Sequence, residues 1–254
     1  MTRPVSLARI LCLLALLAAA GCRSAGPGGG APEPGAQGGE HNGRPGADAT
    51  PAGNGWAWTA PPPAWIGMPA ADDREIAFTY GHQHLVLLDA DGRLMWDVYR
   101  LGLRDVAPLL TAEAVVAATD HGMAAFRRSD GANIWEATEA ERVNTPVVAG
   151  RLVVASTWEG TVIAFDLVDG KAAWRAALPG PSLGPPATDG TTVVVTWDRA
   201  DRRTGGAVAI DAATGRQRWA APLPGGGISA PTVTPNGSAV AVAGDLAAHA
   251  LALG

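Results

Sequence analysis

The sequence predicts an all-β fold, a β-propeller of four-stranded blades with about five repeats, and two regularities support this prediction. The first is a recurring hairpin made of a short apolar strand, a polar turn ending in Gly, and a second strand closing on Trp four residues later. Its four copies occupy residues 87–96, 125–135, 164–174 and 209–219. The second is a regular Trp spacing, with steps of 38, 39, 39 and 45 residues between Trp58, Trp96, Trp135, Trp174 and Trp219. A period of about 40 residues is typical of propeller blades.

Residues 1–22 have the features of a targeting segment. Arg3 and Arg9 precede an apolar run of eleven residues from Ile10 to Ala20. This run is too short to cross a bilayer as a helix, for which about 20 residues are needed, so we interpret it as the hydrophobic region of a secretory signal.

The end of this segment predicts lipid attachment at Cys22. Ala19-Ala20-Gly21-Cys22 resembles a bacterial lipobox, in which Cys22 would become the lipidated first residue of the mature protein, although Leu is usual where Ala19 stands. The alternative is ordinary cleavage after Ala20, which would leave Cys22 as a free thiol. Cys12 leaves with the signal in both cases, so the mature chain keeps one Cys and can form no internal disulfide.

Residues 23–55 are expected to form a disordered tether, and residues 56–254 the propeller domain. The tether is mostly Gly, Pro, Ala and polar residues without apolar periodicity, so it cannot bury enough surface to offset its ordering entropy. Loss of Arg3 and Arg9 takes the net charge from -5 to -7, from 17 basic and 24 acidic residues. An acidic chain of this kind gives no indication of nucleic-acid binding.

The third unit shows the expected parts of a blade. Four strands are predicted at residues 145–148, 151–157, 161–167 and 171–176. In other units the first turn is Asp189-Gly190 or Asn236-Gly237, dipeptides suited to tight hairpins. Val, Ile and Ala dominate the inner strands, as burial between neighbouring blades requires.

The pattern Ala-x-Asp-x-x-Thr-Gly-x-x-x-Trp resembles the PQQ-like, or quinoprotein-dehydrogenase-like, propeller repeat. Residues 209–219 match it fully, the third unit keeps Ala164, Asp166, Gly170 and Trp174, and the second unit has Arg127 in place of Asp. The resemblance covers essentially all of residues 56–254. It implies that Trp58, Trp96, Trp135, Trp174 and Trp219 dock between blades as structural residues.

The two ends of the propeller domain complement each other. The last unit supplies three strands, at residues 230–233, 239–243 and 248–253, while residues 55–59 form a strand without a preceding partner. If the N-terminal strand completes the last blade, residues 56–254 close a five-blade ring without free edges. The alternatives are an open arc that dimerises and a truncated reading frame.

In such propellers the loops that join the fourth strand to the next first strand (D-A) and the second to the third (B-C) share one face, the default binding surface. We call it the D-A/B-C face. The expected D-A loops are residues 97–105, 136–144, 175–184 and 220–229, and the expected B-C loops are residues 82–84, 120–121, 158–159, 198–206 and 244–245. About six extra residues within 198–205 account for the Trp step of 45. They are either a functional insertion or a solvated loop lengthened by drift.

The candidate binding residues on this face are His82, His84, His121, Trp158, Glu159, Trp197, Asp198, Arg199, Asp201, Arg202 and Arg203. Trp158 and Trp197 stand 39 residues apart at equivalent strand ends, where they could stack on a peptide or sugar or pack against an edge. His82 and His84 share one face of the expected strand, a spacing that can hold zinc, but no third ligand stands nearby.

No catalytic, cofactor-binding or metal-binding residue is assigned. Quinoprotein dehydrogenases, by resemblance, use pyrroloquinoline quinone (PQQ) with calcium and an Asp base, often beside a vicinal disulfide. This chain has no second mature Cys, and no hydrolase elbow, zinc-protease motif or phosphate-binding loop is present.

A signal, a lipidated Cys, a tether and a propeller without enzyme apparatus together resemble the non-catalytic BamB-type lipoprotein propellers of the bacterial envelope. The resemblance implies a scaffold anchored by lipid, facing the periplasm from the outer membrane, that binds an envelope protein or an extended peptide. Arg23 after the Cys is compatible with the outer membrane. The alternative is a small-ligand or PQQ-binding propeller with quinoprotein-type redox activity.

Overall fold

The computed structural model describes residues 50–52, 55–60, 64–138, 142–199, 201, 203–225 and 228–253. All of them belong to a compact unit that spans Glu40–Gly254. None of the described residues belongs to a helix that could cross a membrane. The expected signal, Cys22, residues 23–49 of the expected tether and Arg202 lie outside the described residues.

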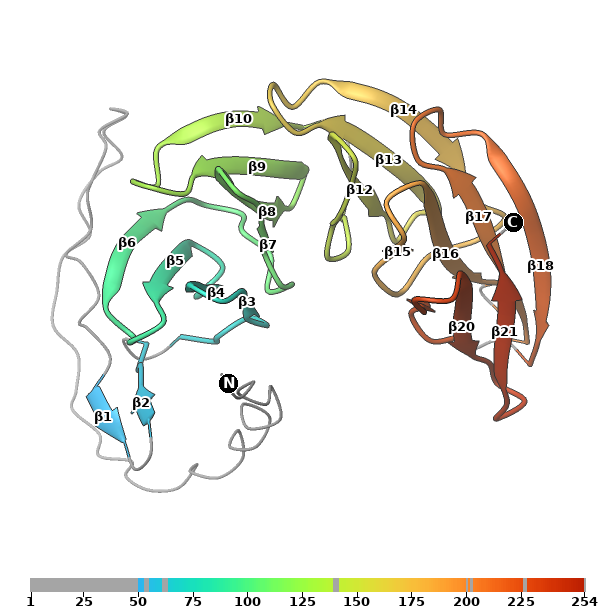
Figure 1. The fold of residues 1–254 in the computed structure, drawn as a ribbon, viewed down its shortest axis with the longest axis horizontal. Helices are drawn as coiled ribbons and strands as arrows, with labels where there is room; N and C mark the ends of the chain where they lie inside the picture. The colour runs from blue at the N-terminus through green and yellow to red at the C-terminus, as the bar shows by residue number, and fades with distance from the viewer. Residues whose placement is uncertain are drawn as a thin grey trace, which may run out of the picture. The chain divides into compact units, whose positions relative to one another are not determined.

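After a two-stranded sheet, five antiparallel sheets of three or four strands follow one another along the described chain, and in each of them the strands pair in chain order (Figure 1). We call the sheets blades 1 to 5 and their strands A to D. Blade 1 consists of β3 (Ala70–Ala71), β4 (Glu75–Tyr80), β5 (His84–Asp89) and β6 (Leu94–Tyr99), and blade 2 of β7 (Leu109–Leu110), β8 (Ala114–Thr119), β9 (Gly122–Arg127) and β10 (Asn133–Ala137). Blade 3 consists of β11 (Val147–Ala149), β12 (Leu152–Ser156), β13 (Thr161–Asp166) and β14 (Ala172–Ala177). Blade 4 consists of β15 (Ala187–Thr188), β16 (Thr192–Asp198), β17 (Thr204–Asp211) and β18 (Gln217–Pro224). Blade 5 consists of β19 (Thr232–Val233), β20 (Ser238–Val242) and β21 (Ala248–Ala252).

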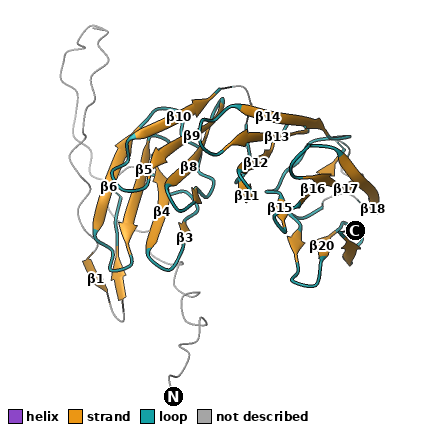
Figure 2. Ribbon diagram, turned by 45° about the horizontal axis from the view of Figure 1, so that its top comes forward, coloured by secondary structure: helices purple, strands orange, loops and turns teal. Residues whose placement is uncertain are grey.

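This architecture confirms the predicted all-β, propeller-type fold, with strands and loops alone in the described chain (Figure 2). The four strands of blade 3 lie within two residues of their predicted bounds. The period of about 40 residues therefore corresponds to one sheet per unit.

The core lies between successive blades, because the B and C strands bury side chains on both faces. Every residue of β8 is buried, for example. One cluster joins Leu87 of blade 1 to Val115 and Phe126 of blade 2, and similar clusters join each later pair of neighbours. Two-sided burial explains why these strands are almost wholly Val, Ile, Leu, Phe and Ala.

A Trp of the D strand joins each blade to the next. Trp96, Trp135 and Trp174 each donate a hydrogen bond from the indole Nε1, 2.9 Å long, to a carbonyl in the C-D turn of the following blade. The accepting carbonyls are those of Arg128, Leu167 and Ala212. Because a buried indole N–H needs a partner, this bond sets the position of the ring as well as its burial.

The Gly of the repeat serves the same contact. Gly131, Gly170 and Gly215 have φ angles of +72°, +70° and +72°, and each lies beneath the Trp of the preceding blade. A Cβ on Gly170 would stand 2.6 Å from the Trp135 ring. The Gly-to-Trp spacing of the motif therefore encodes two different junctions, since the Gly receives the previous Trp while its own Trp reaches the next blade.

The Asp of the repeat closes the C-D turn. The Asp211 carboxylate accepts hydrogen bonds from the backbone N–H and the hydroxyl of Thr214, and it pairs with Arg218 at 2.7 Å. The Arg218 guanidinium and the Thr214 hydroxyl lower the pKa of Asp211 to about 2. In blade 2, where Arg127 replaces this Asp, Asp130 accepts the turn N–H of Ala132 and pairs with Arg127 instead.

The N-terminal strand does not complete the last blade, so that prediction is wrong. Among the described residues β21 pairs only with β20, and β2 (Gly55–Ala57) pairs only with β1 (Thr50–Ala52). The tether predicted to extend to residue 55 therefore includes strand residues. The physical reason is that β2 is held by Trp56, whose Nε1 donates to the Ala90 carbonyl at 3.1 Å.

Trp56, rather than Trp58, makes the hydrogen bond of a docking Trp. Ala90 occupies in blade 1 the position of Arg128, Leu167 and Ala212 in the later blades, directly after the last residue of the C strand. Trp58 packs instead against Phe78 and Tyr80, with ring centroids 4.8 and 5.4 Å apart, and its Nε1 is buried with no partner among the described residues. Trp219 packs against blade 5, and its Nε1 also has no partner there.

The insertion near residue 200 extends the hairpin formed by β16 and β17 of blade 4. β16 and β17 pair from Thr192–Asp211 out to Asp198–Gly205, and β17 continues to pair with β18 as far as Pro224. Gly206 allows this because a Cβ there would lie 2.6 Å from the Ala221 carbonyl and 3.0 Å from the Trp197 indole. Asp198, Thr204 and Gly205 therefore belong to β16 and β17, which corrects their prediction as loop residues, while Arg199, Asp201 and Arg203 lie between the two strands.

Candidate functional site

Exposed apolar side chains gather at one end of the blades. Nine of the twelve large hydrophobic side chains that are exposed among the described residues lie at the end that holds the D-A/B-C face. Four are in its loops, Tyr99, Leu101, Trp158 and Leu183, two are at the β20–β21 turn, Val242 and Leu246, and three are in the segment beside the end of β4, Trp65, Ile66 and Met68. The remaining three, Met95, Ile134 and Val168, lie at or near the C-D turns at the opposite end of the blades. Clustered exposed apolar residues are typical of interaction surfaces.

Trp158 is the best-defined aromatic of this face. It follows β12 in the B-C loop of blade 3, and 43% of it is exposed. Its Nε1 donates to the Asn144 Oδ1 at 3.0 Å. Asn144 is only 5% exposed, and its Nδ2 donates in turn to the Ser156 hydroxyl and to the Ser182 carbonyl. A buried polar network therefore holds the ring of an exposed Trp.

Two arginines lie beside that ring. The Cζ of Arg104 is 5.8 Å and that of Arg142 is 5.9 Å from the Trp158 ring centroid, within the range of a cation–π contact. Both residues belong to D-A loops. Arg104, Arg142 and Asn144 could not be identified as site residues from the sequence. Only their place in these loops pointed to them, and Trp158, which the fold brings beside them, comes from another loop.

His82 and His84 are not brought together, so the expectation that they share one strand face is wrong. His82 lies in a turn with φ +57°, and β5 begins only at His84. His82 Nδ1 faces Asp105 at 3.3 Å, whereas His84 Nδ1 faces Asp97 at 2.8 Å. No three His, Cys, Asp or Glu side chains are grouped as metal ligands in the described part of the chain.

Asp97 bridges a stacked aromatic pair at this end of blade 1. Its side chain is 4% exposed and accepts hydrogen bonds from the Tyr80 hydroxyl and His84, whose rings stack 4.3 Å apart. Burial, followed by the bond to Asp97, raises the pKa of Tyr80, which stays a hydroxyl donor. This cluster fastens the D strand to the B and C strands of the blade.

The other candidate residues divide into buried and exposed. Asp198 is 4% exposed and accepts the Ile228 N–H, and Trp197 is half-buried against the core between blades 3 and 4. Trp197 lies inside β16 while Trp158 follows β12, so their strand ends are not equivalent. The exposed candidates are His121, Glu159, Arg199, Asp201 and Arg203.

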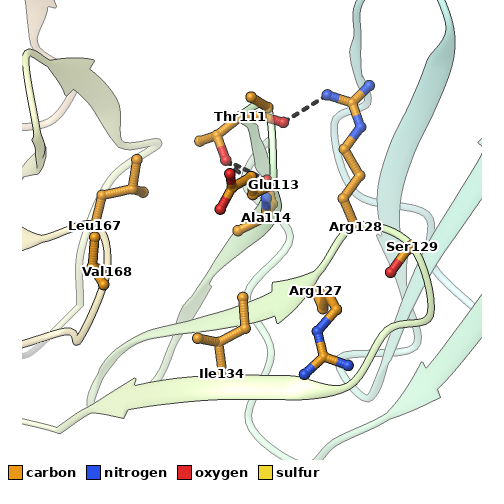
Figure 3. Close-up of a pocket in the computed structure, with 10 residues that line it drawn as sticks. Thr111, Glu113, Ala114, Arg127, Arg128, Ser129, Ile134, Leu167 and Val168 are labelled. Atoms are coloured by element: carbon orange, nitrogen blue, oxygen red, sulfur yellow. Dashed lines mark hydrogen bonds between the residues drawn. The ribbon is translucent and has the colours of Figure 1, made fainter.

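Two cavities lie at the opposite end of the blades, where the A-B and C-D turns meet. A cavity of about 670 Å³ between blades 2 and 3 has Leu167 and Val168 across from Arg127, Arg128 and Ser129 (Figure 3). A second, of about 540 Å³, is built from the corresponding turns of blades 3 and 4. Arg151 pairs with Asp166, Arg218 with Asp211, and Arg128 with Asp72 and Glu75, so these guanidinium groups already have carboxylate partners.

The repeated four-stranded blades and the Trp contacts that join them define a β-propeller protein of the PQQ-like class. The chain belongs to the family whose model is described as Outer membrane protein assembly factor BamB, which matches residues 48–166, 124–203 and 159–252. The Asp-x-x-Thr-Gly-x-x-x-Trp repeat is thus the family motif, and its Trp and Gly are the residues that meet between blades.

Individual relatives agree with this family. The Outer membrane protein assembly factor BamB of Nitrosomonas eutropha is 38% identical over 66 residues, which cover 26% of this chain and 16% of that protein. The crystal structure of BamB from Moraxella catarrhalis shares the fold with a TM-score of 0.56 and 23% identity over 72% of this chain and 58% of that one. Kuenenia stuttgartiensis hydrazine synthase has the same TM-score at 12% identity, over 67% and 52% of the two chains. The matches span less than two thirds of the length of each relative.

Proposed function

We propose that the protein is a non-catalytic, envelope-anchored propeller lipoprotein that acts as a scaffold and binds a partner protein or an extended peptide. The family description and two of the relatives name an outer membrane protein assembly factor. The proposed partners are therefore proteins of outer-membrane assembly. The proposed location is the periplasmic side of the outer membrane, with Cys22 as the lipid anchor.

The gathering of exposed apolar side chains on the D-A/B-C face carries the proposal. Trp and Arg are the residue types that most often dominate binding energy at protein interfaces, and both occur there around Trp158. The ring is already fixed by Asn144, so binding would not have to restrict its motion. Leu101 and Leu183, which are 66% and 45% exposed, would add apolar contact on neighbouring loops.

The second candidate is a small-ligand or PQQ-binding propeller with redox activity. A planar anion could stack on Trp158 beside the two arginines, which favours a carboxylate-bearing ligand in general. The residues do not fit PQQ with calcium, because calcium prefers several oxygen ligands and no three acidic or imidazole side chains are grouped within the described ranges. No catalytic step is therefore assigned to PQQ or calcium.

Affinity capture from membrane fractions tests the scaffold. We expect the wild type to recover an envelope protein after crosslinking in cells, and Trp158→Ala to reduce that recovery by about tenfold or more, as loss of an interface hot spot does. Val168→Ala, at an exposed residue of the opposite end, is the matched control. Trp197 is left intact because its side chain packs in the core.

Two further readouts complete this experiment. Cys22→Ser should release the protein from the membrane fraction if Cys22 is the lipid anchor. Thermal unfolding of Trp158→Ala should resemble that of the wild type, which separates lost binding from lost folding. Equal recovery by Trp158→Ala and Val168→Ala would place the interface elsewhere.

A further inference from the structure

The surroundings of Trp158 form a prepared site rather than a chance exposure. The buried Asn144 side chain is fully engaged, with its Oδ1 accepting from Trp158 and its Nδ2 donating to Ser156 and Ser182. Ser156 in turn donates to the Gly184 carbonyl at 2.9 Å. The network therefore ties the B-C loop of blade 3 to the D-A loops on both sides of it.

The two arginines beside the ring form few ion pairs with other described residues. Arg104 has one distant carboxylate, Asp120, 3.8 Å away, and its Nε is buried with no partner among the described residues. The exposed Arg142 side chain forms no ion pair with any other described residue. Glu159 follows Trp158 in the chain and is exposed. Two guanidinium groups thus lie near one indole ring in a chain whose net charge is -5.

Resting on the proposed function, we propose that Arg104, Arg142 and Trp158 form a carboxylate-binding site, and that the partner segment bound on the D-A/B-C face is an acidic peptide. A guanidinium group binds a carboxylate through paired, charge-assisted hydrogen bonds. The Trp158 ring provides a flat apolar surface for the peptide side chain next to the carboxylate.

A peptide fits the surroundings better than a small polycarboxylate does. Small-ligand sites are usually concave, and neither of the two cavities described above includes Trp158. Leu183 follows Ser182, which accepts from Asn144, and Leu101 precedes Gly102, whose carbonyl accepts the Asp120 N–H. One exposed Leu therefore stands on the loop that carries Arg104, and the other on the D-A loop that follows Trp158. An extended segment of alternating acidic and apolar residues could contact both.

The test is binding of a short, end-blocked, fluorescent peptide of alternating Glu and Leu to the full chain, measured by anisotropy. We expect Arg142→Gln to weaken binding about tenfold, the usual cost of losing a charge-assisted hydrogen bond. Arg216→Gln is the control, because it removes the same charge from an exposed residue of a C-D turn, at the opposite end of the blades. Arg142→Lys should restore only part of the affinity, since it keeps the charge but loses the paired geometry.

The comparison peptide replaces Glu with Gln, and benzene-1,2,4-tricarboxylate serves as the small planar competitor. Selective loss with Arg142→Gln and weak binding of the Gln peptide would support the site. Equal effects of Arg142→Gln and Arg216→Gln, or equal binding of both peptides, would overturn it. Tricarboxylate binding without peptide binding would overturn the peptide and favour a small ligand. Failure with both probes, while Trp158→Ala still abolishes partner capture, would reject carboxylate recognition and leave the scaffold function standing.

Discussion

Replacing Trp135 with Ala is expected to lower the free energy of unfolding by about 3–5 kcal/mol, the usual cost of truncating a buried Trp. Trp135 is 6% exposed and belongs to the cluster between blades 2 and 3. The substitution would leave a cavity over Gly170 and would also leave the Leu167 carbonyl without its indole donor. Both losses fall at one junction, on which the packing of two sheets depends.

Chemical denaturation of the full chain measures this loss. Trp65→Ala is the matched control, because Trp65 is 79% exposed and it accepts the Gly81 N–H through its backbone carbonyl, which the substitution keeps. Its substitution should change stability by no more than about 0.5 kcal/mol. A similar, small effect of both substitutions would contradict the role of Trp135 as a junction between blades.

Replacing Gly170 with Ala should be nearly as damaging, although it adds only one methyl group. The residue has φ +70°, which costs a non-glycine residue about 1–2 kcal/mol. The new Cβ would also lie 2.6 Å from two atoms of the Trp135 ring, and overpacking of this kind costs about 1–3 kcal/mol more. The ring cannot withdraw without losing its hydrogen bond to Leu167.

Gly150→Ala separates the two costs. Gly150 has a similar φ of +63°, but a Cβ there would meet nothing within 4 Å. It should therefore show only the backbone cost of about 1–2 kcal/mol. In a Trp135→Ala background, Gly170→Ala should fall to the same cost, because the ring is gone. Equal effects of Gly150→Ala and Gly170→Ala in the wild type would contradict the close contact.

The blades could be predicted from the sequence because one local pattern fixes each of them. The apolar B and C strands predict two-sided burial. The Gly of the motif marks the C-D turn, and the Trp four residues later marks the D strand. Trp96, Trp135 and Trp174 make equivalent contacts because they occupy the same position of this pattern. Periodicity alone was sufficient for this part of the fold.

The ends of the domain could not be predicted in the same way. Trp56 lies in β2 and Trp58 directly follows it. The step of 38 residues favoured Trp58, whereas the Ala90 carbonyl accepts from Trp56. Strand complementarity suggested a partner for β21, but it contains no information on the distance between the two strands. β2 pairs instead with β1 in a local hairpin, with Ala52 opposite Gly55.

The candidate site was located on the right loops only in outline. Trp158 was identifiable because it is a Trp outside the docking positions. Arg104, Arg142 and Asn144 come from two other loops, and their approach to Trp158 depends on how blades 1, 2 and 3 pack. Asp198 and Trp197 were placed at the surface because the insertion was interpreted as a loop, whereas both belong to β16, where Asp198 is buried and Trp197 is half-buried.

Site-specific photocrosslinking in cells tests most directly the claim that the D-A/B-C face binds the partner. A photoreactive residue would be placed at Leu101 or Leu183 on that face, and at Val168 at the opposite end; all three side chains are exposed. We predict that positions 101 and 183 crosslink to the same envelope protein and that position 168 does not. Crosslinking from position 168 alone would contradict the account and place the interface at the C-D turns.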